Sequence, residues 1–448
     1  MFPYLPHTRE DRKKLMEGIG ITEIDELFTD IPEAVKLDRE LDLGQPLSEF
    51  EVKERMKYLS GRNENLEEYT SFLGAGIYDH YIPSVVDHIL LRSEFYTAYT
   101  PYQAETSQGY LQAIFEYQTL ICELTGLDVA NASMYDGASA IAEAALMSTA
   151  VKRRRREIII SKTVSPESRE VLKTYCDAVD LELVEVDYKD GVTNSDQLDE
   201  LVSEKTAGVI IQNPNFFGQL EDLAEMAEVV HQAGALFIVS ADPISLALLE
   251  APGNLGADIV VGEGQALGNP LNFGGPHLGF LATTKKNMRR IPGRVIGETE
   301  DEEGNRGYVM TLQTREQHIR RERATSNICS NQALNALAAT VYLTLLGKEG
   351  LKKVAKQSAR KAHYAAQKIN QLEGYEVLFN GPFFKEFAVK AHKSIEEINE
   401  ELLTANIIGG YDLEADYSDL ENGMLLAFTE KRTKAEIDQL AAQLEGVK

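Results

Sequence analysis

The chain has 448 residues, of which 43% are hydrophobic and 26% charged, enough apolar surface for two or three globular domains. Its formal net charge of −26 argues against generic nucleic-acid binding, because that binding depends on basic surface. Three cysteines, Cys122, Cys176 and Cys329, are far apart and form no pair with metal-ligand spacing. We therefore expect reduced thiols, no bound metal and a cytoplasmic protein.

The N-terminal part, residues 1–75, is predicted to be a helical segment. Its first residues carry acids among the bases and no apolar core, so we expect neither a secretory signal nor a transit peptide. No apolar run in the chain reaches the length of a membrane span. A surface helix is predicted over residues 48–62, with Ser48 as N-cap and Glu51 three residues later. A glycine-rich turn at residues 72–76 ends this segment.

Residues 76–330 are predicted to form a large α/β domain. A helical stripe covers residues 108–124, and short apolar runs then alternate with helical patterns. This alternation is typical of a mostly parallel sheet. The expected strands are residues 157–161, 181–187, 207–214, 235–241 and 257–262, and the expected helices between them are 165–179, 220–233 and 241–249. The strand at 279–284 follows its predecessor without a helix, which favours an antiparallel partner in the same sheet.

Residues 331–448 are predicted to form a smaller α+β domain. Two helices, residues 332–346 and 351–372, lead into it. The expected strands are residues 375–379, 386–391 and 423–428, and the expected helices are residues 394–405 and 434–444.

A tyrosine-rich segment at residues 94–109 is a candidate ligand-binding or interface segment. Tyrosine combines an apolar ring with a polar tip, as ligand pockets and interfaces require. The candidate residues are Tyr96, Tyr99, Thr100, Tyr102, Gln103, Glu105, Ser107 and Gln108. The alternative is an aromatic loop that packs onto the core, and the residues alone leave both open.

Polar residues at strand ends and at one helix start are candidates for an anion or cofactor site. Ser133, Asp136, Gly137 and Ser139 open an alanine-rich helix, whose free N–H groups suit a phosphate; plain capping is the favoured alternative. Asn213 ends a strand but also begins an ordinary Asn-Pro turn. Asp242 follows a strand end, near where a pyridoxal enzyme has a pyridine-pairing aspartate, although a helix N-cap with Pro243 at the first helical position is the favoured interpretation.

Two basic runs, residues 152–156 and 315–327, are further candidates. The first follows the alanine-rich helix, so we interpret it as a solvated helix end and keep an acidic docking partner as a minor option. The second carries His318 and fits either a phosphate contact or a surface helix.

The run from Asp258 to Phe280 contains no lysine. In one large class of α/β enzymes, a lysine just after such a strand forms a Schiff base with pyridoxal phosphate, and this chemistry requires a primary amine. The scaffold therefore resembles a pyridoxal enzyme that lacks its amine.

Several long strings together resemble one family, the P-protein of the glycine cleavage system. They read FLGAGIYDHYIPSVV (72–86), YTAYTPYQAETSQG (96–109), MYDGASA (134–140), NPNFFGQLED (213–222), NFGGPHLGF (272–280) and QTREQHIRRERATSNICSNQAL (313–334). The resemblance runs from MFPYLPHT at the start into the C-terminal domain. It implies a large domain of the pyridoxal-phosphate-dependent transferase type (fold type I).

This family occurs as one long chain with two similar halves or as two subunits, and the missing lysine resembles the first half or subunit 1 (α). Gln265 lies near the lysine position, and Ala241 falls where the pyridine-pairing aspartate would be, with Asp242 one residue later. Gln265, Asp242 and His277 are therefore vestigial cofactor-site candidates, and no catalytic residue is assigned to this chain.

The resemblance implies glycine dehydrogenase (aminomethyl-transferring), which decarboxylates glycine with pyridoxal phosphate and transfers the aminomethyl group to the lipoyl arm of H-protein. The Schiff-base lysine would come from a partner β subunit in an α2β2 assembly, to which this chain lends the segment around Tyr96–Gln108. Two alternatives remain: a self-sufficient pyridoxal enzyme that uses Lys285 or Lys286, and a non-catalytic structural or regulatory subunit.

Overall fold

The structure of the chain is a computed structural model that describes residues 7–37, 39–313, 316–324, 326–328 and 330–446. The chain divides into two units, residues 1–65 and residues 66–448. Cys122 and Cys176 are free thiols, whereas Cys329 lies outside the described residues. Within those residues, every helix is too short or too polar to cross a membrane.

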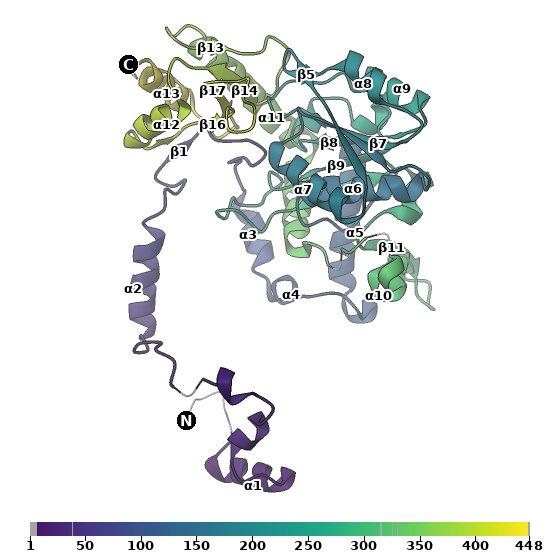
Figure 1. Ribbon diagram of the computed structural model, residues 1–448, viewed down its shortest axis with the longest axis vertical. Helices are drawn as coiled ribbons and strands as arrows, with labels where there is room; N and C mark the ends of the chain where they lie inside the picture. Colours follow the sequence, from purple (N-terminus) through teal and green to yellow (C-terminus); the bar gives the residue numbers. More distant parts are fainter. Residues whose placement is uncertain (1–6, 38, 314–315, 325, 329, 447–448) are drawn as a thin grey trace. The chain divides into compact units, whose positions relative to one another are not determined.

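The first unit consists of short helices joined by extended chain. Its elements are α1 (Arg9–Ile19), the 3-10 helices η1 (Ile24–Phe28) and η2 (Glu33–Val35), and α2 (Glu49–Ser60) (Figure 1). A capping box of Ser48 and Glu51 begins α2, which confirms the predicted helix start. Thr8 and Asp11 form the same arrangement at α1.

The second unit is built on a seven-stranded sheet in the order β2-β10-β9-β8-β7-β3-β4. Its strands are β2 (Val129–Ala130), β3 (Glu157–Ser161), β4 (Glu182–Val186), β7 (Thr206–Asn213), β8 (Leu236–Ala241), β9 (Ile259–Glu263) and β10 (Gly279–Thr283). The strands from β9 to β4 run parallel, and β10 pairs antiparallel with β9, as predicted. This arrangement confirms an α/β domain with a mostly parallel sheet.

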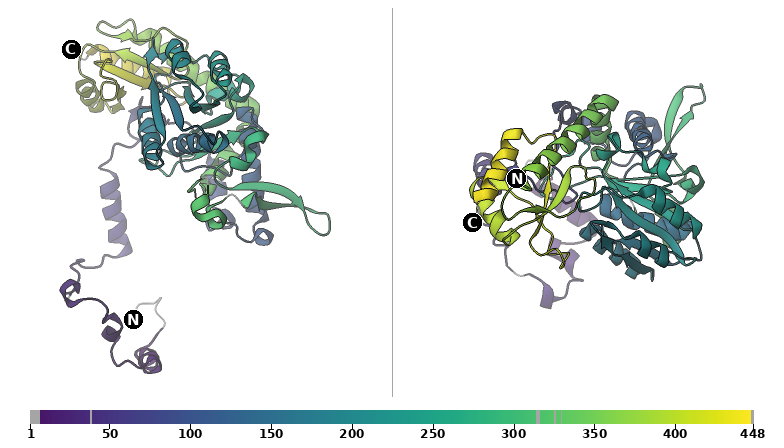
Figure 2. Two further views of the ribbon diagram at one scale, coloured as in Figure 1. Left: turned by 45° about the vertical axis from the view of Figure 1, so that its right-hand side comes forward. Right: turned by 90° about the horizontal axis from the view of Figure 1, so that it is seen from above.

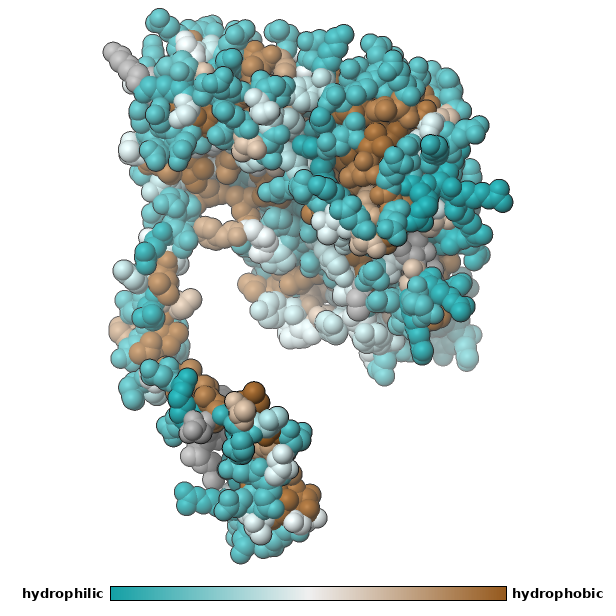
Figure 3. Space-filling model, viewed as in Figure 1, coloured by the Kyte–Doolittle hydropathy of each residue, from teal (hydrophilic) through white to brown (hydrophobic). Residues whose placement is uncertain are grey.

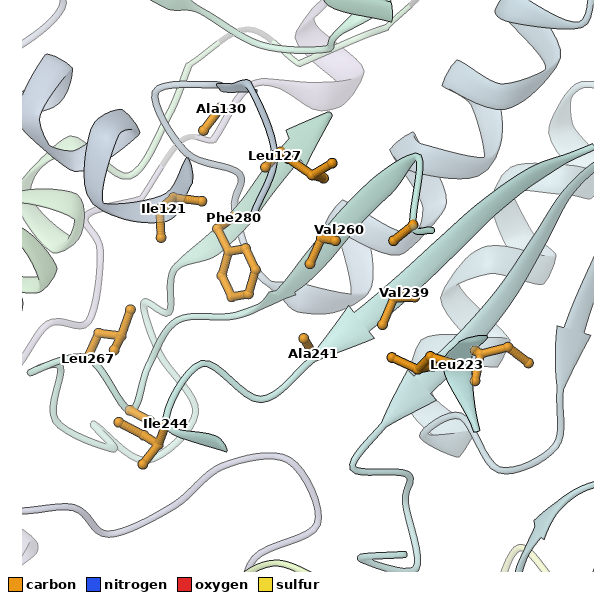
Figure 4. Close-up of a cluster of buried hydrophobic side chains, with 14 of the residues drawn as sticks. Ile121, Leu127, Ala130, Leu223, Val239, Ala241, Ile244, Val260, Leu267 and Phe280 are labelled. Carbon is orange, nitrogen blue, oxygen red and sulfur yellow. The ribbon is translucent and has the colours of Figure 1, made fainter. Parts of the chain in front are cut away.

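Helices cover both faces of this sheet, so its strands are apolar on both sides. The helices are α5 (Gln108–Thr125), α6 (Gly137–Val151), α7 (Pro166–Ala178), α9 (Leu223–Gln232) and α11 (Ala333–Ile369). In β3, Ile159 joins the core formed with α5, α9 and α11, whereas Ile158 and Ile160 join the core formed with α6 and α7. Figure 4 shows part of the first core, where Val239 and Val260 project from neighbouring strands.

The C-terminal part of this unit is a four-stranded antiparallel sheet in the order β13-β14-β17-β16. Its elements are β13 (Glu376–Val377), β14 (Glu386–Lys390), β16 (Tyr411–Asp412), β17 (Gly423–Ala427), α12 (Ile395–Thr404) and α13 (Lys434–Gly446). The two predicted helices before it are both present: they form α11 and meet at Gly347, whose non-helical backbone, with a φ of 55°, only glycine adopts easily. Strand β1 (Thr70–Ser71) pairs with β15 (Ile407–Ile408).

Shorter elements complete the unit. They are α3 (Ser84–Leu90), α4 (Ser93–Tyr96), α8 (Ser195–Leu201), α10 (Gln317–Arg320), the hairpin β5 (Tyr188–Lys189) and β6 (Val192–Thr193), and the hairpin β11 (Val295–Glu300) and β12 (Arg306–Thr311). The second hairpin projects from the unit, as Figure 2 shows, and was not expected from the sequence.

The predicted helix at residues 241–249 is wrong. Only a 3-10 turn forms there, at Ser245–Ala247. The Asp242 carboxylate accepts hydrogen bonds from the backbone N–H groups of Ile244 and Ser245, which stabilises a tight turn as an alternative to a helical turn.

Candidate functional site

A cavity of about 510 Å³ opens at the carboxyl-terminal ends of the parallel strands, the edge at which such sheets bind ligands. The segment before α3, the start of α6, the ends of β8 and β9, and the start of β14 contribute its walls. Its ionisable and polar lining includes Tyr78, Asp136, Glu167, Gln212, Asp242, Glu263, His277, Lys385 and Glu386.

A buried ion pair crosses this cavity. The Lys385 ammonium, at the start of β14, lies 2.5 Å from Oδ2 of Asp242, just after β8, and 3.4 Å from the centre of the Tyr78 ring. Only 2% of the Lys385 side chain is exposed. Burial alone would raise the pKa of Asp242, but the Lys385 ammonium outweighs it and holds that pKa below its usual value. Asp242 is therefore ionised and already paired.

His80 extends this network toward the end of β17. Its Nε2 lies 3.2 Å from the Lys385 ammonium, which can only donate, so Nε2 accepts and Nδ1 carries the proton. Nδ1 lies 2.6 Å from Oε2 of Glu430. Burial and the neighbouring Lys385 charge lower the pKa of His80, in agreement with a neutral ring.

Glu386 is buried beside Lys385 and accepts two hydrogen bonds. The Tyr78 hydroxyl donates to Oε2 at 2.5 Å, and the Ala75 backbone N–H donates to Oε1 at 2.7 Å. Burial raises the pKa of Glu386 to about 7. The loop before α9 approaches closely here: a Cβ on Gly218, whose φ is 82°, would lie 2.0 Å from the Glu386 carbonyl oxygen. The loop therefore holds the start of β14 against the cavity.

A carboxylate occupies the N-terminus of α6. Oε2 of Glu263 accepts from the backbone N–H of Gly137 at 2.9 Å, and Oδ1 of Asp136 caps the N–H of Ser139 at 2.7 Å. Oε1 of Glu263 accepts from the N–H groups of Gln265 and Leu278. Burial raises the pKa of Glu263 to about 7. Two of the donors that a phosphate would use at this helix start, the N–H groups of Gly137 and Ser139, already bind the protein's own carboxylates.

Gln265, near the expected lysine position, has a structural role. Its side-chain oxygen accepts from the backbone N–H of Tyr78 at 3.1 Å, and its amide donates to the Asn269 carbonyl at 2.7 Å. Lys285 and Lys286 lie in the 3-10 helix η6 (Lys285–Arg290) and do not line the cavity. Among the described residues, Lys385 is the one lysine on its wall.

Four of the eight residues predicted as vestigial cofactor-site candidates line the cavity, and two more contact its lining. Asp136, Gly137, Asp242 and His277 line the cavity, and Ser139 and Gln265 are hydrogen-bonded to its lining. The other two candidates point elsewhere. Ser133 accepts from the backbone N–H of Gln332 at 3.0 Å, and the Asn213 side chain accepts from that of Glu221 at 3.0 Å.

The tyrosine-rich segment does not reach this cavity. Tyr96, Tyr99 and Tyr102 are 63 to 77% exposed, and Gln103 and Glu105 are also exposed. A second hollow of about 350 Å³ lies against the segment. Tyr99, Thr100 and Ser107 are among the residues that line it.

Two of the candidate residues of this segment form side-chain hydrogen bonds to distant parts of the chain. Gln108 donates to the Tyr308 carbonyl and accepts from its N–H, each at 2.8 Å, and thereby ties α5 to β12. Thr100 accepts from Arg294 at 3.2 Å. These two residues support the segment from within, while the tyrosine rings remain on its surface.

The two basic runs lie on the surface. Arg155 donates to the Thr206 carbonyl at 2.7 Å, and Arg156 binds the carbonyls of Val179 and Asp180 after α7. In the second run, α10 and the 3-10 helix Arg321–Arg323 are exposed; Arg315 and Thr325 lie outside the described residues. None of the described residues of either run lines the cavity.

Sequence reasoning missed Tyr78, Glu263, Lys385 and Glu386, which line the cavity, and His80, which contacts Lys385 behind its wall. Lys385 and Asp242 are 143 positions apart in the sequence, so no local pattern connects them. The available signal was weak: a lysine and a glutamate directly precede an apolar strand.

These contacts do not fit pyridoxal phosphate, the cofactor that the resemblance implies. The helix start that would hold a phosphate binds Glu263 and Asp136, the aspartate available to a pyridine nitrogen is paired with Lys385, and a glutamine lies near the lysine position.

Comparisons with known proteins agree on one family. Residues 3–444 match the family described as glycine cleavage system P-protein. A relative from Carboxydothermus hydrogenoformans is 58% identical and one from Bacillus cytotoxicus 57% identical, each over 99% of both chains; both are named probable glycine dehydrogenase (decarboxylating) subunit 1. A crystal structure titled glycine decarboxylase (P-protein) of the glycine cleavage system, in inhibitor-bound form, is 43% identical and covers 99% of this chain and 100% of its own, with a TM-score of 0.92.

A more distant structure shares the fold alone. Glutamate decarboxylase from Lactobacillus brevis has a TM-score of 0.68 at 14% identity, covering 93% of this chain and 95% of its own. The fold-type I prediction is confirmed by these structural likenesses.

The ion pair yields a first prediction. Replacing Lys385 with Met leaves Asp242 as a buried, unpaired carboxylate and should lower the free energy of unfolding by about 3 kcal/mol. Denaturant unfolding of the isolated chain measures this change in the free energy of unfolding. Lys390→Met, at an exposed lysine of the same strand, should change stability by less than about 0.5 kcal/mol, and adding Asp242→Asn to Lys385→Met should restore part of the loss. Equal effects at positions 385 and 390 would contradict the structural role.

Glu386 yields a second prediction, on pH. A carboxyl group whose pKa rises from 4.5 to about 7 on folding binds its proton more tightly in the folded chain, so stability falls as pH rises between these values. Between pH 5 and pH 8, the free energy of unfolding should therefore fall less in Glu386→Gln than in the unchanged chain, with a difference of roughly 2 kcal/mol. Thermal unfolding at the two pH values measures this difference. Gln can still accept from Ala75 and donate to Tyr78. Glu376→Gln, on exposed β13, serves as the control, and an unchanged pH slope in Glu386→Gln would refute the assignment.

Proposed function

This chain belongs to the family of glycine cleavage system P-proteins. We propose that it is subunit 1 of a two-subunit glycine dehydrogenase and that the Schiff-base lysine is on subunit 2. The enzyme decarboxylates glycine and transfers the aminomethyl group to the lipoyl arm of H-protein. Pyridoxal phosphate, when bound in the assembled enzyme, supplies the electron sink for the negative charge that develops on the glycine carbon when CO2 leaves. This chain alone is therefore expected to be inactive.

The observation that carries this division of labour is the set of contacts around the cavity. Glu263 binds the N–H of Gly137 at the start of α6, and Lys385 pairs with Asp242, so groups that could hold a phosphate or a pyridine nitrogen are already bound to the chain's own side chains. The fold is that of a pyridoxal enzyme, but its own cavity supports no covalent step. We therefore assign the chain a role in building and completing the partner's site.

Two competing functions make different demands on the structure. A self-sufficient enzyme would need a free amine at the cavity; Lys285 and Lys286 lie elsewhere, and the Lys385 ammonium is bound to Asp242. A purely structural subunit would need no exposed polar and aromatic segment. The tyrosine rings and Gln103 are exposed, and Tyr99 lines a hollow, which favours a contribution across an interface.

The remaining parts of the proposal follow from the family. We propose a symmetric α2β2 assembly, lipoylated H-protein as the acceptor and glycine as the substrate. A cytoplasmic location is supported by the free thiols Cys122 and Cys176.

The location of the amine can be tested directly. The isolated chain is mixed with pyridoxal phosphate and reduced with borohydride, and peptide mapping then seeks a fixed adduct. We expect no adduct at a defined lysine of this chain, and one in subunit 2 when the complex is treated. A stoichiometric adduct at Lys385, which Lys385→Met abolishes, would instead establish a self-sufficient enzyme.

The tyrosine-rich segment can be tested in the assembled enzyme. Tyr99→Ala or Gln103→Ala should reduce glycine-dependent CO2 exchange about ten-fold or more, because positioning groups are lost from the reacting partner's site. Light scattering should show that the complex still forms. Leu403→Ala, at an exposed apolar residue of α12, is the matched control. Full exchange activity in both segment variants would remove this segment from the site.

A further inference from the structure

The first unit of the chain has no core of its own. Of the described residues from 7 to 65, only Asp11, Met16, Ile21 and Asn65 are even partly buried, and none is fully buried. Helices α1 and α2 have 11 and 12 residues, a length at which isolated helices are marginal in water. Their helix starts are well capped, so the local structure is specified although nothing within the segment covers it.

The uncovered side chains are apolar and regularly spaced. Val52, Met56 and Leu59 follow one face of α2, and Leu15 and Ile19 are neighbours on α1. Between the helices, exposed leucines continue along extended chain at residues 41, 43 and 47. Figure 3 shows hydrophobic residues exposed along this unit. A surface of this kind is typical of an interface.

The second unit offers too little exposed apolar surface to match it. Among the described residues, sixteen of the 28 exposed large hydrophobic side chains lie between residues 15 and 59, and the other twelve are spread over a region some six times longer. This distribution favours another chain as the source of the complementary apolar surface.

The size of this surface indicates a permanent interface. Covering sixteen such side chains at roughly 60–120 Å² each would remove about 1,000–2,000 Å² from water on this chain alone. A standard interface buries about 800 Å² per partner, and obligate interfaces bury more. Both the family match and the relatives' alignments include the segment, so it is an integral part of the subunit.

We propose that residues 7–65 are a docking arm that packs its apolar face onto subunit 2 of the dehydrogenase. This inference rests on the proposed function, because it requires that partner. Charge disfavours a second copy of this chain as the occupant: residues 1–65 carry fifteen acidic and ten basic side chains, and the whole chain has a charge of −26, so an arm docked on a second copy would meet net charge of its own sign.

The test compares two triple variants of the full chain. The arm variant carries Val52→Ser, Met56→Ser and Leu59→Ser, which are 39 to 58% exposed; the control carries Val179→Ser, Leu248→Ser and Leu403→Ser, which are 39 to 42% exposed. Affinity for purified subunit 2 is measured by analytical ultracentrifugation, together with the melting temperature and mass of each chain alone. We expect the arm variant to bind at least ten-fold more weakly, with an unchanged melting temperature, and the control to bind normally.

The possible outcomes distinguish three surfaces on which the arm could pack: subunit 2, its own chain and a second copy of this chain. Unchanged affinity in the arm variant would overturn the proposal. A lower melting temperature of the isolated arm variant would show that the arm packs on its own chain, and conversion of an isolated dimer to a monomer would show a second copy as its partner; either result refutes docking to subunit 2. If the unchanged chain does not bind subunit 2 at all, the proposed function itself fails.

Discussion

The buried pair of Lys385 and Asp242 is the interaction on which the character of this molecule depends. It joins the end of β8 in the large sheet to the start of β14 in the C-terminal sheet, and His80, Tyr78 and Glu386 are arranged around it. A buried charge pair is costly to desolvate, and either partner left alone would be costlier still. The two sheets are therefore held in a defined relation around the cavity by charge and not by apolar packing alone.

The same groups explain why a pyridoxal-enzyme fold can persist without the chemistry usually associated with it. The parallel sheet still opens a cavity at its carboxyl edge, and α6 still directs its N-terminus there. Glu263 satisfies that helix start, and Lys385 neutralises the aspartate, so both positions are stable without a bound anion or ring. Side-chain charges thus stabilise this edge of the sheet, and we propose that the function of the chain depends on surfaces that face other chains, namely the tyrosine-rich segment and the first unit.

The regular elements were predictable because their patterns are local. The strands at 157–161 and 235–241 and the helix α5 appear within a residue or two of their expected bounds, since apolar periodicity alone specifies which face is buried. The helix expected at 241–249 failed because the Asp242 side chain binds its own backbone and Lys385, an interaction that periodicity does not register. The hairpin of β11 and β12 was missed because its pairing depends on residues on both sides of an acidic turn and on Gln108.

By itself, the sequence determined the class of fold, the capped helices, the family resemblance and the absence of a lysine between Asp258 and Phe280, because each of these is written in contiguous residues. Only the tertiary structure decided which contacts are formed around the position where a pyridoxal enzyme has its lysine. Gln265 binds the backbone of Tyr78, Glu263 binds the start of α6, and Lys385 reaches Asp242 from 143 positions away. These contacts depend on burial and on distance in space, which only the folded chain establishes.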